Sequence, residues 1–139
     1  MTILATTLPA RSADSRPARL NLRPRVKTFG VRGQSDGAWW PRTTVLQDEL
    51  QALDVAVHTL TGSRIAHISY TLGTWDPVPT KAWSTLGMTK FGWFADPTHA
   101  AFLDLTLSDY SRLVLTIIPP DTEPSQAHLD LAKGAAAAA

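Results

Sequence analysis

Two short segments gather the residue types best suited to hold a ligand. GAWWPR at residues 37–42 contains two adjacent tryptophans and an arginine, and TWDP at residues 74–77 contains a third tryptophan beside an aspartate. A tryptophan offers a large apolar ring with one N–H donor, and the two charged groups would add charge-assisted hydrogen bonds. The predicted binding surface consists of Trp39, Trp40, Arg42, Thr43, Thr44, Trp75 and Asp76.

Arg42 stands directly before a predicted helix, where a cation faces the positive end of the helix dipole and therefore needs a partner. One interpretation is an ion pair within the chain, for which the candidate acids are Asp48, Glu49 and Asp76. The other is an external anion, bound by Arg42, by the hydroxyl groups of Thr43 and Thr44 and by free N–H groups of the helix. The sequence favours the internal ion pair and leaves the anion site open.

Trp39 and Trp40 should point to opposite sides if the chain is extended there. We expect one of them to cover a face of the sheet, and the other to lie partly exposed with its indole N–H hydrogen-bonded. Trp75 could share a groove with Trp40, and exposed rings beside a basic segment would suit single-stranded nucleic acid. Tryptophans at strand ends are more often core residues, and that is the favoured interpretation.

The sequence lacks the usual catalytic and metal-binding patterns. The chain has no cysteine, which excludes disulfides, zinc–thiolate sites and cysteine nucleophiles. Its four histidines, at residues 58, 67, 99 and 128, do not stand three or four residues apart. Neither a G-x-S-x-G sequence nor a phosphate-binding glycine loop occurs. We therefore predict no catalytic residue, no metal and no cofactor.

Charge is divided unevenly along the chain. Residues 1–32 carry seven arginines and lysines against one aspartate, a net charge of +6, whereas residues 33–139 carry six against eleven acids, a net charge of −5. A basic segment ahead of an acidic body can serve an anionic partner, and it can equally be solvated or fold back on that body. The basic residues in question are Arg11, Arg16, Arg19, Arg23, Arg25, Lys27 and Arg32.

Length and composition predict one α+β domain. We expect a disordered basic arm at residues 1–18, a single domain at 19–134 and an uninformative alanine tail at 135–139. No signal peptide is recognisable, and the most apolar run, LVLTII, is far shorter than the roughly 20 residues that span a membrane. These features favour a cytoplasmic location and no membrane partner.

The expected fold is an antiparallel sheet of five or six strands packed on one main helix, with a short C-terminal helix. The helix should run over 44–60, capped by Thr44 with Gln47 completing a capping box, and present a leucine stripe to the sheet. After a first strand at 19–23 and a long loop at 28–42, the strands expected in a meander are 65–72, 81–85, 88–94, 100–107 and 112–118. Their alternating leucines, from Leu103 to Ile117, should form the floor beneath the helix.

GAWWPR before a helix, WDPVP after a strand and IIPPDTEPSQAH near the end resemble an actinobacterial family of small proteins of unknown function. The likeness covers about residues 20–132 and implies no activity. It implies a shared framework of Trp39, Trp40, Pro41, Arg42, Trp75, Asp76, Pro77, Pro119, Pro120 and Asp121.

The leading functional hypothesis is a non-catalytic cytoplasmic binding module for an unknown protein partner. The first alternative is an RNA- or ribosome-associated accessory protein that uses the basic arm, and the second is an enzyme with a Trp/Arg/Asp pocket. Steep weakening of binding with salt would indicate nucleic acid, and a concave pocket with perturbed titratable groups would indicate an enzyme.

Overall fold

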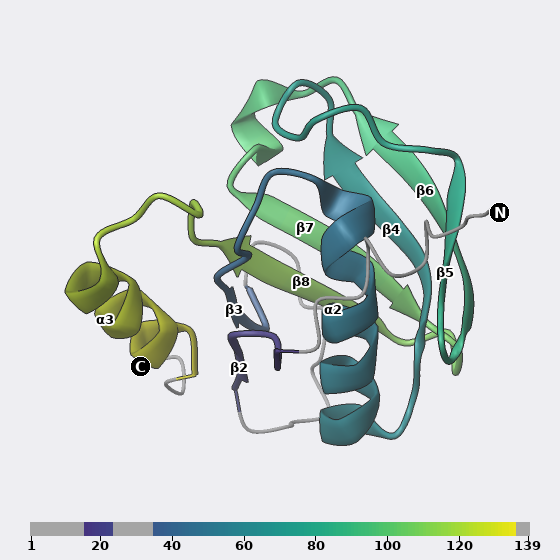
Figure 1. Ribbon diagram of the computed structural model, residues 1–139, viewed down its shortest axis with the longest axis horizontal. Coiled ribbons are helices and arrows are strands. Elements are labelled where there is room, and N and C mark those ends of the chain that lie inside the picture. The colour runs from purple at the N-terminus through teal and green to yellow at the C-terminus, as the bar shows by residue number, and fades with distance from the viewer. Residues whose placement is uncertain (1–15, 24–34, 136–139) are drawn as a thin grey trace, which may run out of the picture.

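The computed structural model describes residues 16–23 and 35–135 (Figure 1). Of the predicted basic arm, Arg11, Arg25, Lys27 and Arg32 lie outside the described residues. The strands are β2 (Leu20–Leu22), β3 (Gly37–Trp39), β4 (Ile65–Thr71), β5 (Lys81–Ser84), β6 (Gly87–Phe94), β7 (Phe102–Leu107) and β8 (Arg112–Ile117). The helices are α2 (Leu46–Thr61), the 3-10 turn η1 (Pro97–His99) and α3 (Pro124–Ala135).

The described strands form one seven-stranded mixed sheet in the order β2-β3-β8-β7-β4-β6-β5. The class is α+β as predicted, but the prediction of a wholly antiparallel sheet of five or six strands is wrong in detail. β3 pairs with β8 in parallel, and so does β4 with β6. Helix α2 crosses one face of this sheet, and α3 lies at the β2–β3 end (Figure 1). No helix among the described residues is long and apolar enough to span a bilayer.

Two local features explain the mixed topology. Residues 37–39 were predicted as part of a glycine-rich loop, yet they pair with β2 on one side and β8 on the other. The hairpin of β5 and β6 was predicted to continue a meander from β4, but β6 lies beside β4 and β5 takes the edge. A Cβ on Gly37 would overlap the carbonyl oxygen of Asn21 and approach the Leu22 Cα to 2.9 Å. Glycine is therefore what allows β3 to pair so closely with β2.

The leucine stripe of α2 packs on the sheet as predicted. Leu46, Leu50, Leu53 and Val57 are fully buried, whereas Leu60 at the end of the stripe is exposed. Facing them are the buried side chains of β7 and β8, which are Leu103, Leu105, Leu107, Leu113 and Leu115, and the half-buried Ile117 lies at their margin. The predicted cap, Thr44, is wrong: α2 begins after Val45, whose side chain makes no capping hydrogen bond.

The opposite face of the sheet is covered at one end by α3. Ala127 and Leu131 of this helix are buried against Ala38, Trp40 and Ile118. A Cβ added at Gly134 of α3 would lie 2.8 Å from the Ala38 backbone nitrogen, so the helix and β3 approach as closely as glycine permits. The predicted C-terminal helix is thus confirmed. Its expected cap, Asp121 or Thr122, is replaced by Glu123, which accepts the Gln126 N–H at 3.2 Å.

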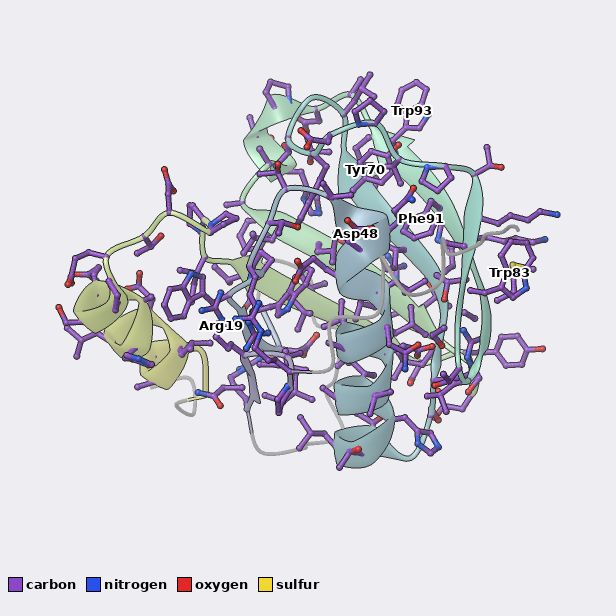
Figure 2. All side chains as sticks on the ribbon, viewed as in Figure 1. Arg19, Asp48, Tyr70, Trp83, Phe91 and Trp93 are labelled. Atoms are coloured by element: carbon purple, nitrogen blue, oxygen red, sulfur yellow. The ribbon has the colours of Figure 1, made fainter. Side chains whose placement is uncertain are left out.

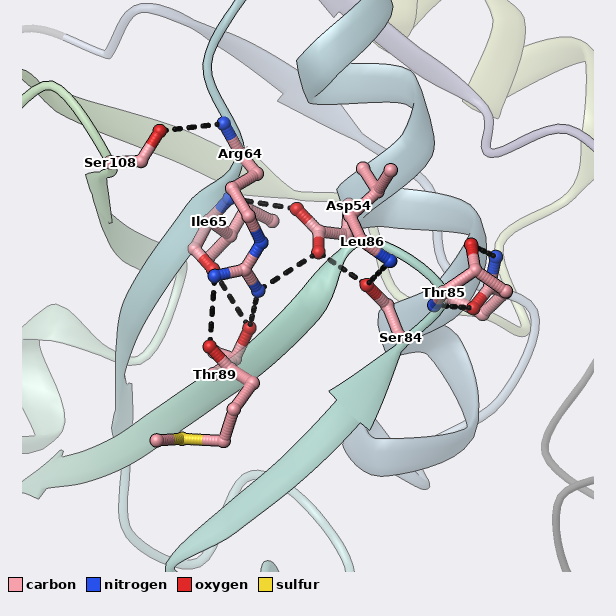
Figure 3. Close-up of polar contacts among 10 residues, drawn as sticks. Asp54, Arg64, Ile65, Ser84, Thr85, Leu86, Thr89 and Ser108 are labelled. Atoms are coloured by element: carbon pink, nitrogen blue, oxygen red, sulfur yellow. Dashed lines mark hydrogen bonds and ion pairs between the residues drawn. The ribbon is translucent and has the colours of Figure 1, made fainter.

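A buried polar network holds α2 to β4, β5 and β6 (Figure 3). The carboxylate of Asp54, which has no exposed surface, accepts the Ile65 N–H at 2.7 Å, the Ser84 hydroxyl at 2.6 Å and the Arg64 guanidinium at 3.1 Å. Arg64 also donates to the Thr89 hydroxyl at 3.0 Å. A buried charge persists only when it is paired and hydrogen-bonded in this way, so the network fixes where the β5–β6 hairpin lies.

Candidate functional site

The three distinctive sequence segments meet at one corner of the sheet. The Ile118 N–H donates to the Trp39 carbonyl oxygen at 2.8 Å, which joins the GAWWPR and IIPPDT segments. The rings of Trp39 and Trp75 stack with centroids 5.8 Å apart, and the Asp76 N–H donates to the Thr44 carbonyl oxygen at 2.9 Å. Residues far apart in the sequence thus form a single structural unit beside the start of α2.

Trp39 and Trp40 point to opposite sides of β3, as predicted, but neither is partly exposed. Trp39 is buried in the core under α2, and Trp40 keeps only 6% of its surface exposed because α3 covers it. The Trp40 indole N–H donates to the Pro120 carbonyl oxygen at 3.3 Å. The expected exposure was wrong because the sequence did not show that α3 folds onto this side of the sheet.

Two arginines of the predicted arm have partners inside the fold. The Arg19 guanidinium lies 3.6 Å from the Trp40 ring centroid and donates to the carbonyl oxygens of Trp40 and Pro41, both at 3.0 Å. Figure 2 shows Arg19 in the space between α3 and α2. Partial burial, followed by the nearby Arg42 charge, lowers the pKa of Arg19. Arg23 pairs with the buried Asp36 at 3.6 Å, so both residues support β2 and β3.

Hydrogen-bond donors just before α2 are paired with a carboxylate of the chain itself. Glu49, which is nearly buried, accepts the Arg42 backbone N–H at 3.2 Å and the Thr43 hydroxyl at 2.8 Å. The Arg42 guanidinium donates to the Pro17 carbonyl oxygen at 2.9 Å. Two of the donors that an external anion would need are therefore occupied by Glu49, which weakens the anion-site interpretation.

A pocket of about 690 Å³ opens at this corner. Its lining comes from four segments and is mostly apolar: Thr44, Thr74, Trp75, Ala100, Ala101, Ile117, Pro119, Pro120 and Asp121. The indole Nε1 of Trp75 is buried and has no hydrogen-bond partner. A buried donor without an acceptor is rare, because leaving it unpaired costs about 1–3 kcal/mol.

The structure brings only part of the predicted surface to this pocket. Thr44 and Trp75 line it, and Trp39 lies behind Trp75. Arg42 and Thr43 contact Glu49 and Pro17 instead, and Asp76 is exposed in the adjacent turn. Ala100 and Ala101 of the pocket lining were not predicted, because small residues after η1 carry no signal in the sequence, whereas residues 119–121 belong to the distinctive IIPPDT segment.

The pocket offers little acid–base chemistry. Asp121 is the one ionisable side chain in its lining, and it is exposed. Among residues 16–23 and 35–135, no three histidines, cysteines or acids lie close enough to hold a metal ion. What the described pocket can provide is apolar contact and ring stacking.

Residues 19–133 match the family described as "Family of unknown function (DUF5994)", and the chain belongs to that family. The resemblance drawn from the sequence to a family of unknown function is thereby confirmed at the level of the family. No curated protein and no solved structure matches the chain.

Proposed function

We propose that this protein is a non-catalytic binding module whose corner pocket takes an apolar side chain of a partner protein. The observation that carries the proposal is the open, mostly apolar pocket that Trp75, Ile117 and Pro119 line together. A partner side chain that fills the pocket would remove this apolar lining from water, which favours association.

The shape of the pocket favours a segment of protein over a free small molecule. Five lining residues are exposed at its rim, namely Thr44, Thr74, Ala101, Pro119 and Asp121. Small-molecule sites usually enclose most of their ligand, whereas an open apolar depression suits a single anchor residue of a larger interface. The polar rim formed by the threonines and Asp121 matches the anatomy of such interfaces.

Contacts within the fold also hold the walls of the pocket together. Trp75 stacks on the buried Trp39, and the Ile117 N–H donates to the Ala101 carbonyl oxygen at 2.8 Å, which joins two walls. On the remaining side, the Trp40 indole holds the Pro120 carbonyl oxygen. Preorganisation of this kind reduces the entropy lost on association.

The test uses a random peptide library displayed on phage and selected against the full chain. The variant A101W would fill the pocket from its exposed rim, and A132W places the same ring on an exposed position of α3 as a matched control. We expect selected peptides to carry a conserved aromatic or aliphatic residue, to bind wild type and A132W alike, and to lose at least tenfold affinity for A101W. In ¹⁵N spectra they should shift the Trp75 indole N–H resonance.

Peptides that bind A101W as well as wild type would refute the proposed site. So would a Trp75 indole resonance that stays unchanged at saturation, since Trp75 lines the pocket.

A further inference from the structure

The sheet face opposite α2 carries a row of aligned side chains that includes three cations. Residues of β5, β6, β4, β7 and β8 alternate between the two faces, and Ala82, Ser84 and Thr89 face α2, where they pack on the core or join the Asp54 network. The neighbours of these residues along each strand therefore point to the opposite face. Cross-strand pairing aligns Lys81 with Lys90, Lys90 with His67, His67 with Thr106, and Thr106 with Arg112.

This row spans five strands, or about 19 Å at the usual spacing of about 4.8 Å between strands. Lys81 and Lys90 are exposed, and 66% of the Arg112 side chain is exposed. Residues 33–139 have six arginines and lysines in total and a net charge of −5. Half of these cations stand in one row, so the face is basic although the body is acidic.

The row is unfavourable for the isolated chain. Lys81 and Lys90 are directly opposite each other on an antiparallel pair, and like charges in that position destabilise a sheet. The acid that this face presents among the described strands is Asp104, which is 12% exposed and already bonded to His99 at 2.8 Å and paired with Arg112 at 3.7 Å. No acid of the described strands lies opposite the two lysines, so an external anion would relieve their repulsion.

Aromatic rings flank the row on both sides. Trp83, 64% exposed, projects from the same face as Lys81, whose Nζ lies 5.7 Å from the indole centroid. On the other side His99 packs between Phe94 and Phe102, at centroid distances of 5.0 and 5.4 Å. Exposed rings beside lysines and arginines are the combination that stacks bases while neutralising phosphates.

We infer that this face binds single-stranded nucleic acid, with its backbone along the row from Lys81 to Arg112 and a base on Trp83. A single strand is required because a base inside a duplex cannot stack on a side chain. An acidic protein segment could pair with the lysines but would gain little from Trp83. The surface is separate from the corner pocket, so this inference does not rest on the function proposed above.

The test measures fluorescence anisotropy of labelled ten-nucleotide oligo(U) and oligo(dT) with the full chain at 50–200 mM salt. For single-stranded nucleic acid, each phosphate contact adds about 0.7 to the slope of the logarithm of affinity against the logarithm of salt concentration. One contact therefore contributes roughly eightfold to the affinity at about 50 mM salt. We expect K90Q and R112Q each to weaken binding by about that factor and to flatten the slope. The matched control K133Q removes an exposed lysine of α3 and should bind as wild type.

Trp83 has its own matched control in Trp93, which is 58% exposed on the adjacent strand and, by alternation, on the face of α2. Figure 2 shows Trp83 at the right edge of the molecule and Trp93 at the top. W83A should weaken binding roughly 5- to 150-fold, the range for one stacked base, and W93A should not.

Three outcomes would overturn the inference: no binding at 50 mM salt, equal loss in K90Q and K133Q, or equal competition by a duplex or by polyglutamate. Binding that none of these substitutions weakens would also overturn the inference and, because the arm residues are the same in every variant, would point to the arm.

Discussion

Truncation of Asp54 should destabilise the fold far more than the loss of an ordinary hydrogen bond. Its carboxylate accepts three hydrogen bonds and has no exposed surface. D54A therefore leaves the Ile65 N–H without its acceptor and the Arg64 guanidinium without its counter-ion, although Arg64 keeps its hydrogen bond to Thr89. Removing one member of a buried ion pair typically costs 3–5 kcal/mol. Because 19% of the Arg64 side chain remains exposed to water, we expect a cost of about 3–4 kcal/mol, toward the lower end of that range.

Urea unfolding of D54A, R64M and the double variant measures this network directly. Since R64M removes the stranded cation, the double variant should lose less than the sum of the single losses, by about 0.5–3 kcal/mol. Q51A is the matched control, because Gln51 joins the same helix to the same hairpin through two exposed hydrogen bonds with Thr85, for which about 0.5–1.5 kcal/mol is expected. If D54A costs no more than Q51A, the buried network does not position the hairpin.

Three further substitutions test the packing and the backbone. L50A removes a fully buried side chain of α2 and should cost about 2–5 kcal/mol in urea melts; a loss below about 0.5 kcal/mol would contradict the packing of α2. G134A places a methyl group against Ala38 and should cost about 1–3 kcal/mol, with a lower Tm and weaker protection of α3 amides from hydrogen exchange. Tyr110 has φ of 70° in an exposed turn. Because asparagine tolerates that conformation, Y110N should stabilise the fold by up to about 1 kcal/mol and raise the Tm. An unchanged Tm would show that the turn is not strained.

The regular parts of the fold could be predicted because their hydrophobic pattern is local. The spacing of Leu46, Leu50, Leu53 and Val57 repeats every three or four residues, and β7 alternates leucine with polar residues. Each pattern specifies the element and its buried face without reference to the rest of the chain. The register of β7 on β8 follows, since Leu103 and Leu105 meet Leu115 and Leu113.

The pairing of short strands could not be predicted, because it depends on contacts distant in sequence. β3 has three residues, and a loop could show the same sequence pattern. Its place beside β8 is fixed by the hydrogen bond between Trp39 and Ile118, which are far apart in the chain. The burial of Trp40 depends in turn on α3. The same limit applies to the pocket: Trp75 was predicted to belong to a binding surface, but its neighbours in the pocket come from the turn after η1 and from the end of β8 and the segment that follows it.

The corner pocket and the aromatic group beside the cationic row adjoin at one segment, residues 99–102. Ala100 and Ala101 line the pocket, while His99 and Phe102 belong to the aromatic group on the open face. This segment is held on both sides, by the hydrogen bond from Ile117 to the Ala101 carbonyl oxygen and by the contact between His99 and Asp104. Because backbone and side-chain bonds both anchor it, a ring added at the exposed Ala101 should fill the pocket without moving the aromatic group. A101W therefore reports on the pocket alone, and the substitutions at Lys90 and Trp83, several strands away, report on the face alone.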